Sequence, residues 1–374
     1  MSEPLSQIPD GMRYHFGREA RLRRSVEEIV MAVFDGWSYE EISTPTVDYY
    51  SLFEHGMGPT QAHRAFRFTD TDGRLLVLRP DVTSGVARAA VTMFSERDRP
   101  LRLCYAAQVF RQQPQSHAEW RRESTQTGCE LLGANTVAAD MEVMTIASEI
   151  LQRLGLNGDH LITLNDVGIF KGISERLKLD AVSGDDLRQL VDSRNAADLA
   201  QFLDRLAYAP EECSALIRLT QLSGKRGTVE GARRVITNKR SVEALDRLDR
   251  LWRTVESLDL DKHFEIDLGD VAKLDYYTGV TFNIYVNGAA VKIGSGGRYD
   301  GLTAAFGKAE PAVGFVLDLD ALTEVLLARA QNPDLSQVTE PSVSTMTGTD
   351  TSLLFRKARS KRAEGQRVLI NFER

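Results

Sequence analysis

The sequence has few cysteines, no long apolar run and no excess of positive charge. Its 374 residues contain only Cys104, Cys129 and Cys213, whose wide spacing gives neither a disulfide framework nor a zinc-type pair. No apolar run is long enough to cross a membrane, and the first residues lack the apolar centre of a signal peptide. These absences predict a protein of the reducing cytoplasm without a membrane part.

The charge and histidine patterns exclude two further classes of site. The chain has 46 Lys and Arg against 53 Asp and Glu, a net charge of −7, so no whole-protein attraction to nucleic acid is expected. Its six histidines show no helical ligand spacing, which predicts no metal site and no cofactor. The segment Ser223–Thr228, SGKRGT, lacks the upstream glycine of a phosphate loop, and we predict an interhelical turn there.

Hydrophobic periodicity predicts strands and hairpins that alternate with isolated helices. Helices are expected over about 17–34, from Thr83 as N-cap, over 140–154 and over 320–330. Strands are expected over about 39–44, 101–111, 122–132, 161–164, 264–268 and 312–317, with a hairpin over 65–79. Because the strict βαβ rhythm of a parallel sheet is missing, the pattern indicates an α+β fold with a mainly antiparallel sheet.

A second hairpin dominates the later part of the chain. Alternating residues over Val280–Val286 predict a strand, Asn287-Gly288 a tight turn, and Ala289–Ile293 the return strand. The glycine-rich stretch that follows is expected to be an exit turn. Within it, Arg298 could bind a carboxylate or a phosphate through its forked guanidinium.

The chain divides by composition into a core and a tail. Residues 1–326 form the predicted core, and the almost purely helical stretch from about 168 to 258 is an insertion within it. Residues 327–374 are predicted to be a linker rich in Ser, Thr and Pro, followed by a short tail. In the tail, 353–362 could form a basic helix and 367–372 a strand.

Two strings joined by the second hairpin resemble the family-specific motifs of histidyl-tRNA synthetases. They are Leu274–Thr278, LDYYT, and Gly296–Gly301, GGRYDG. The resemblance runs from about Ile8 to Leu326, and the segments similar to the three class II motifs are Tyr39–Phe53, Tyr105–Gly133 and Ala312–Leu322. It implies a class II aminoacyl-tRNA synthetase-like core that dimerises through the first motif. The anticodon-binding domain of that family has no full counterpart.

The positions that serve adenylation in that family are mostly altered here. Arg111 matches the arginine that contacts the α-phosphate and the amino-acid carboxylate. The glutamate that holds the nucleotide falls at Gln113, and the aromatic residue that stacks on adenine falls at Ser124. The third-motif arginine falls at Ala321, and the histidine-specific catalytic arginine at Ala272. Since each lost donor costs about 10² to 10³ in rate, we predict no catalytic residue and no adenylation.

The amino-acid pocket of the family is better matched. The resemblance implies a histidine-binding set of acidic, hydroxyl, amide and aromatic side chains with one arginine, namely Asp81, Thr83, Arg111, Gln126, Glu130, Tyr276 and Tyr277. Such groups complement a zwitterion that carries a two-nitrogen ring. Equally, they could persist as hydrogen-bond partners that support the fold.

A synthetase body without adenylation residues resembles the regulatory subunits of ATP phosphoribosyltransferase. That resemblance implies a non-catalytic subunit required by a short-form catalytic subunit in the first step of histidine biosynthesis. Histidine would be its feedback effector, and a dimer of the chain would lie within a hetero-oligomer. Two alternatives stay open: a histidyl-tRNA synthetase-like amino-acid-activating enzyme, and a stand-alone histidine sensor.

Overall fold

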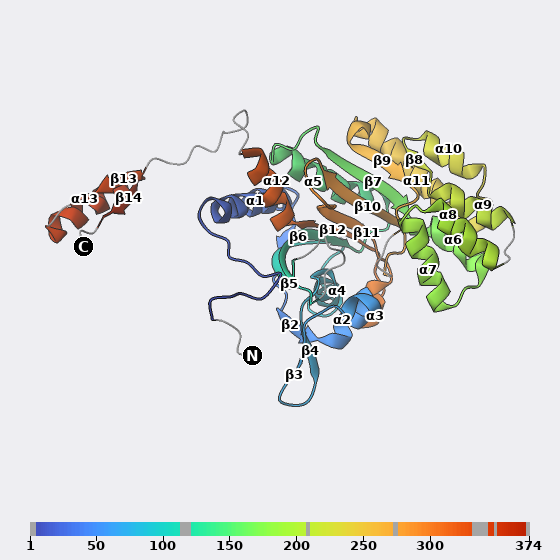
Figure 1. Cartoon of the computed structure of the whole chain (residues 1–374), viewed down its shortest axis with the longest axis horizontal. Coiled ribbons are helices and arrows are strands. Elements are labelled where there is room, and N and C mark those ends of the chain that lie inside the picture. The colour runs from blue at the N-terminus through green and yellow to red at the C-terminus, as the bar shows by residue number, and fades with distance from the viewer. Residues whose placement is uncertain are drawn as a thin grey trace. The chain divides into compact units, whose positions relative to one another are not determined.

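A computed structural model describes residues 5–112, 121–206, 210–271, 276–330, 343–347 and 350–371 (Figure 1). The chain divides into two compact units, Met1–Val325 and Leu326–Arg374. No helix of the described residues is long and apolar enough to cross a membrane.

A nine-stranded sheet forms the centre of the first unit. Its order is β1-β5-β6-β12-β11-β10-β7-β9-β8, and every neighbouring pair is antiparallel except β1 with β5 and β7 with β9. The mainly antiparallel sheet predicted from sequence is confirmed. The strands are β1 (Glu40–Glu41), β5 (Leu101–Phe110), β6 (Glu123–Leu132), β7 (His160–Asp166), β8 (Ser223–Gly224), β9 (Phe264–Asp267), β10 (Val280–Val286), β11 (Gly294–Arg298) and β12 (Ala312–Asp318).

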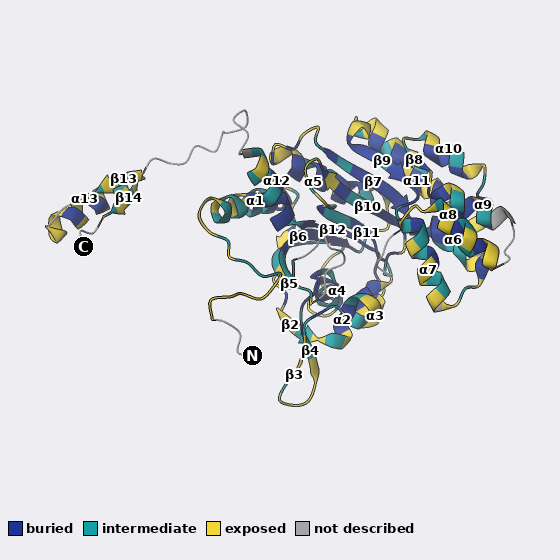
Figure 2. Cartoon of the chain, viewed as in Figure 1, coloured by how far each residue is buried: buried dark blue, intermediate teal, exposed yellow. Residues whose placement is uncertain are grey.

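Helices α1 (Gly17–Gly36), α5 (Val137–Arg153) and α11 (Lys239–Ser257) contact strands of this sheet. Their buried stripes meet apolar side chains that point from alternate strand positions, as in the contact of the Phe34 ring with Phe315 at 6.1 Å between centroids. Figure 2 shows the strands buried between the surrounding elements. Helix α12 (Leu319–Ala330) follows β12. Its first turn is capped by Asp318, whose Oδ1 accepts a hydrogen bond from Ala321 N at 2.8 Å.

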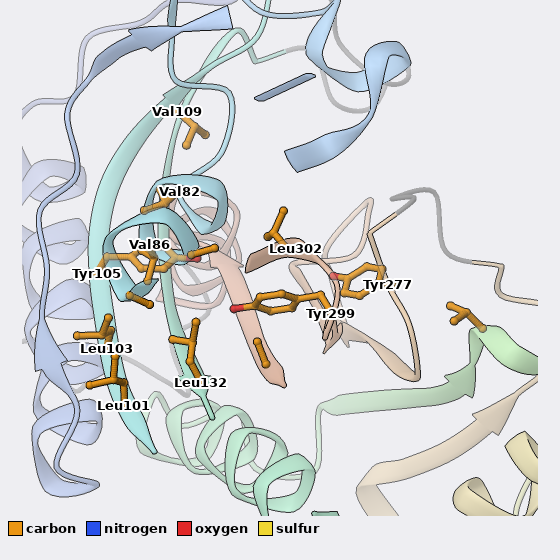
Figure 3. Packing of buried hydrophobic residues seen from close by; sticks show 14 residues of the cluster. Val82, Val86, Leu101, Leu103, Tyr105, Val109, Leu132, Tyr277, Tyr299 and Leu302 are labelled. Carbon is orange, nitrogen blue, oxygen red and sulfur yellow. The ribbon is translucent and has the colours of Figure 1, made fainter. Parts of the chain in front are cut away.

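A further group of elements adjoins α4 (Thr83–Val91), which contacts two of them directly. It contains α2 (Tyr50–Met57), α3 (Pro59–Ala62), the 3₁₀ helix η2 (Leu302–Phe306) and a small sheet of β2 (Val47–Tyr49), β4 (Leu75–Leu78) and β3 (Arg67–Thr69). A hydrophobic cluster joins α4 and η2 to the large sheet, with Tyr105, Tyr277 and Tyr299 among its buried residues (Figure 3). This cluster lies beneath the candidate site described below.

The predicted helical insertion is confirmed as a group of short capped helices. They are α6 (Val167–Leu177), α7 (Ala181–Asp192), α8 (Ala196–Arg205), α9 (Pro210–Leu219) and α10 (Gly227–Arg233), followed by α11 and the 3₁₀ turn η1 (Asp261–His263). Asp166, Asp180, Asn195 and Asn238 cap four of these helices through side-chain oxygens. The predicted turn at Ser223 is wrong in part, because Ser223–Gly224 pairs with β9 as strand β8.

Two strand predictions near the sheet are also wrong. The strand expected over 39–44 is reduced to β1, which pairs parallel with β5. The return strand expected over Ala289–Ile293 lies instead at Gly294–Arg298, with the loop closed by Ile293 N donating to Ile284 O at 2.9 Å. Glycines disfavour strands in isolation, but here close neighbours require them: a Cβ on Gly296 would lie 2.4 Å from the Phe282 ring.

The second unit contains a small βαβ element. Strand β13 (Val343–Met346) pairs parallel with β14 (Arg367–Ile370), and α13 (Thr351–Ala363) connects them after a cap from Asp350. The predicted basic helix and the last strand are confirmed. Strand β13 corrects the prediction of a linker over residues 343–346, since the short segment VSTM is paired by a segment more than 20 positions later.

Candidate functional site

A pocket of about 410 Å³ lies over the sheet face opposite to helix α1. Strand alternation on β6 separates the two faces: Ser124 and Gln126 line the pocket, whereas Thr125 between them contacts Arg23 of α1. The remaining walls come from the β4–α4 junction, the end of β5, strands β10 and β11, and the segment that carries the tyrosine pair. The pocket therefore gathers residues that are far apart in the sequence.

Six of the seven predicted site residues line this pocket. They are Asp81, Thr83, Arg111, Gln126, Tyr276 and Tyr277. The seventh, Glu130, is 1% exposed and does not line the pocket; it lies beneath the wall, where it accepts a hydrogen bond from Thr83. Whether these side chains bind a ligand is taken up below as a proposal.

Glu130 is the centre of a buried hydrogen-bond cluster. Its Oε1 accepts from Thr83 Oγ1 at 2.7 Å and from Tyr105 OH at 3.1 Å, and its Oε2 accepts from Tyr299 OH at 2.5 Å. Burial raises the pKa of Glu130 to about 7, although these three donors oppose the rise. The carboxyl can consequently change its charge near neutral pH.

Three glycines make room for this cluster. A Cβ on Gly314 of β12 would lie 1.8 Å from Glu130 Oε2, and a Cβ on Gly128 of β6 would lie 2.7 Å from Tyr105 OH. On β11, a Cβ on Gly297 would lie 2.8 Å from the Tyr277 ring. The bare backbone of these three strands lets a carboxylate and two aromatic rings lie close against the sheet, and we call these residues the glycine floor.

Asp81 supplies a second buried carboxylate, directly in the pocket wall. It accepts from Ser84 N at 3.2 Å and from Ser84 Oγ at 3.4 Å. Burial raises the pKa of Asp81, while these bonds and the nearby Arg111 guanidinium act against the rise. The predicted N-cap role of Thr83 is wrong, because Val82 occupies that position and the Thr83 hydroxyl donates to Glu130.

Tyr276, Tyr277 and Tyr299 form an aromatic wall, and the first two of them line the pocket. The Tyr276 ring lies 4.7 Å from the Tyr277 ring and 5.6 Å, edge to face, from the Tyr299 ring. Figure 3 shows the Tyr299 and Tyr277 rings in the hydrophobic cluster above the sheet. Rings packed in this way present a rigid apolar surface to a planar ligand group.

At the other end of the pocket, the cationic side chain of Arg121 is already engaged by carboxylates. Arg121 lines it, but the guanidinium pairs with Glu324 and lies 3.7 Å from Asp318. Ser124 offers a hydroxyl where a ring would stack on adenine, and Ala321 is buried in the first turn of α12. The altered positions Gln113 and Ala272 lie outside the described residues.

The electrostatics of the pocket favour a cation over a polyanion. Its lining includes four carboxylates, Asp81, Asp192, Asp270 and Asp318, against three cationic side chains, Arg111, Arg121 and Lys292. Burial raises the pKa of Asp270 and of Asp318, as expected where like charges gather away from water. An ammonium group would relieve this repulsion, whereas a triphosphate would add to it.

Sequence reasoning missed some members of the site and misjudged one neighbour. The missed members are Tyr105 and Tyr299, which donate hydrogen bonds to Glu130. Two signals could have found them: Tyr105 is on the pocket side of β5 by strand alternation, and Tyr299 lies in the string GGRYDG. Arg298 does fork onto a carboxylate, Asp140, with Nη2 at 2.6 Å and Nε at 3.0 Å from Oδ1. That pair is buried on the helix side of the sheet, away from the pocket. Within the described ranges, no cluster of three or more His, Cys, Asp or Glu could hold a metal ion.

The chain is similar to proteins of one family over most of its length. A model of the family "Histidyl-tRNA synthetase" matches residues 11–322. The "ATP phosphoribosyltransferase regulatory subunit" of Moorella thermoacetica is 35% identical over 98% of this chain and 92% of that protein. The protein with the same name from Bacillus pumilus is 31% identical over 98% of this chain and 91% of its own length.

Solved structures agree in fold. A crystal structure described as an ATP phosphoribosyltransferase regulatory subunit/histidyl-tRNA synthetase from Bacillus halodurans has a TM-score of 0.84 and 28% identity, covering 99% of this chain and 93% of that one. Histidyl-tRNA synthetase from a Nostoc species has a TM-score of 0.77 at 20% identity, covering 100% of this chain and 87% of that one. The second likeness concerns the fold alone.

Proposed function

The chain belongs to the histidyl-tRNA synthetase family and, within it, to the ATP phosphoribosyltransferase regulatory subunits, and we propose that it makes a short-form catalytic subunit active and sensitive to histidine. One observation carries this proposal: the pocket keeps the groups for a small zwitterion, while its nucleotide end has lost them. The groups suited to a zwitterion are those around Asp81 and Tyr277. At the nucleotide end, the Arg121 guanidinium is engaged by Glu324.

The proposed effector is histidine, bound in the pocket. The α-ammonium would pair with Asp81 and the Thr83 hydroxyl, and the carboxylate with Arg111. Gln126 can donate to one ring nitrogen and accept from the other, and the imidazole would lie against the Tyr276–Tyr277 wall. Beneath them, Glu130 would hold Thr83 and Tyr299 in place and add negative charge.

Inhibition would follow from linkage and not from a direct block of the reaction. An effector changes a partner's activity only if it binds two states of the complex with different affinity. We propose that the catalytic subunit favours one arrangement of this chain, and that histidine favours the other. A coupling free energy of about 1–3 kcal/mol would change activity by about 5–150-fold.

The proposed assembly is a dimer of this chain within a larger complex in the cytoplasm. Support comes from the first-motif region, where Val47 and Tyr49 on β2 and Phe68 on β3 leave apolar side chains exposed. Register places Tyr49 and Phe68 on one face of the small sheet, since both pair with Leu76. A second copy or the catalytic subunit would cover this face.

Mixing the purified chain with a short-form catalytic subunit should restore phosphoribosyl transfer from phosphoribosyl pyrophosphate to ATP. We expect activity at least about tenfold above that of the catalytic subunit alone, and histidine should reverse it by about 5–150-fold. The rate is followed by product absorbance, and light scattering of the co-eluting complex gives its mass and tests the dimer.

The same preparation separates the alternatives. Histidine-dependent exchange of pyrophosphate into ATP by the pure chain would identify an amino-acid-activating enzyme and contradict the proposal. Histidine binding without co-elution or activation of any short-form catalytic subunit would instead favour a stand-alone sensor.

Histidine affinity should fall as the pH is lowered through 7. Burial raises the pKa of Glu130 to about 7, so its side chain is mostly protonated below that pH. The proton must leave before the carboxylate can stabilise the α-ammonium of bound histidine, and this cost weakens binding. We expect about tenfold weaker binding at about pH 6 than at about pH 8, with proton release on binding at the lower pH. Calorimetry in two buffers of different ionisation enthalpy measures both quantities.

Replacing Glu130 with glutamine is the control for this pH effect. The amide keeps the shape of the side chain but cannot titrate, so proton release should disappear apart from the contribution of the ligand's own imidazole. The stability of the ligand-free protein should change with pH in the direction opposite to that of the histidine affinity. Because the folded pKa of Glu130 is raised, its contribution to stability is full below about pH 4.5 and is lost as the pH rises through about 7. Unchanged proton release in Glu130→Gln would exclude Glu130 as the titrating group.

A further inference from the structure

Helix α6 of the insertion contacts the backbone of the aromatic wall directly, at Tyr277. Lys171 Nζ donates to the carbonyl oxygen of Tyr277 at 2.9 Å. One turn earlier in the same helix, Val167 N donates to Gly279 O at 3.0 Å. The first turns of α6 therefore hold the chain on both sides of residue 278, immediately after the two rings that line the pocket.

Helix α6 is in turn fixed to α11. Ser241 Oγ of α11 donates to Ile169 O at 2.7 Å, and a Cβ on Gly172 would lie 2.4 Å from that hydroxyl oxygen. The Arg247 guanidinium grips the buried Asp166, the cap of α6, with nitrogen–oxygen distances of 2.9 and 3.0 Å. These contacts pack α6 tightly against α11.

The insertion also holds the chain that leads toward the tyrosines. Arg194, between α7 and α8, pairs with Asp267 at the end of β9. Asn165 Nδ2, in the residue before the cap of α6, donates to Asp270 O at 2.8 Å. Asp192, the last residue of α7, and Asp270 both line the pocket. The helical insertion thus contacts the chain before the tyrosines through Arg194 and the chain after them through Lys171.

We propose that Lys171 is a positioning residue that couples occupancy of the pocket to the helical insertion. The inference rests on the proposed function, because it takes histidine as the occupant. A ring that packs against Tyr277 shifts or fixes the backbone of that residue, and the charge-assisted bond to its carbonyl passes the displacement to α6 and α11. By reciprocity, anything that holds the insertion in one position changes histidine affinity by the same factor.

The test replaces the Lys171 ammonium and keeps its stem, as Lys171→Met. We expect histidine to bind about tenfold more weakly by calorimetry, within the usual range of coupling between sites. Histidine should protect the amides of α6 and α11 from hydrogen exchange in the unaltered chain, and this distant protection should be lost in Lys171→Met. Lys171→Arg, which retains a cationic donor, should restore both. Lys239→Met is the matched control, since the Lys239 side chain is 90% exposed at the start of α11.

A second variant tests the relay if Lys171→Met does not fold. Ser241→Ala removes one hydrogen bond between α11 and α6 but leaves the Arg247–Asp166 pair and the Lys171–Tyr277 contact. Histidine affinity should change by less than about threefold, while protection should persist in α6 and decrease in α11.

The possible failures are distinguishable. If the unaltered chain bound no histidine, the proposed function and the coupling would both be rejected. If the unaltered chain bound histidine and Lys171→Met matched it in affinity and in protection of α6, only the role of Lys171 would be overturned. Equal losses in Lys171→Met and Lys171→Arg would show that the position is needed for folding and not for coupling.

Discussion

Replacing Asp81 with asparagine is expected to weaken histidine binding by about 30-fold or more. Asp81 is 8% exposed and lines the pocket, as does Thr83 two positions later. Removing one partner of a buried, hydrogen-bonded charge pair costs about 2–5 kcal/mol, and every 1.4 kcal/mol is tenfold in affinity. Titration calorimetry at about pH 8 measures the effect where Glu130 is ionised.

Asparagine is a sharper probe here than alanine. Its side-chain oxygen can still accept from Ser84 N, so this hydrogen bond to the first turn of α4 is kept and the loss is confined to charge. Asp72→Asn, at the exposed turn between β3 and β4, is the matched control and should bind histidine as the unaltered chain does. Equal affinities for Asp81→Asn and Asp72→Asn would remove Asp81 from the site and leave it a residue that supports the fold.

The fold could be predicted from sequence wherever local patterns and final contacts agree. The strand predicted over Val280–Val286 forms because β10 lies between two strands and buries its apolar residues, Val280, Phe282, Ile284 and Val286. The capped, amphipathic helices of the insertion also follow from their own residues. Periodicity does not indicate which distant segments meet. The motif strings do, because the family resemblance predicts that Gln126 and Tyr276 lie in one pocket.

The missed elements share a cause that lies outside their own sequence. Strand β11 is mostly glycine, so no propensity marks it; its register is set by β10 and β12, and its glycines are required by the rings of Phe282 and Tyr277. Strand β8 has two residues and exists only because β9 is there to pair with it.

Six of the seven residues predicted from the resemblance line the pocket, but their arrangement was not predictable. Thr83 has the residue type and position of a helix cap, but its hydroxyl turns to Glu130 because that buried carboxylate needs donors. Glu130 itself was expected in the pocket lining, and it lies one layer deeper, since Gly314 leaves a space beside it that only the structure reveals. The depth at which such a side chain lies depends on the pairing of strands that are distant in sequence, here β6 with β12.

The glycine floor leads to the largest expected loss of stability. Gly314→Ala should lower the free energy of unfolding by about 3 kcal/mol, at the upper end of the usual cost of overpacking. The added Cβ would lie 1.8 Å from Glu130 Oε2, and also 2.5 Å from the carbonyl oxygen of Cys129. Glu130 could swing away only by giving up its tyrosine partners, and the backbone oxygen cannot move without opening the β6–β12 ladder.

Urea unfolding followed by far-UV circular dichroism would measure this loss as a lower midpoint at an unchanged slope. Gly184→Ala is the matched control, because nothing lies within 4 Å of the added Cβ in the middle of α7. That variant should be neutral or more stable by about 0.5–1 kcal/mol, as expected for glycine to alanine inside a helix. If Gly314→Ala were as stable as Gly184→Ala, the sheet would be able to relax around Glu130, and the glycine floor would not be what holds the carboxylate and the tyrosines under the pocket.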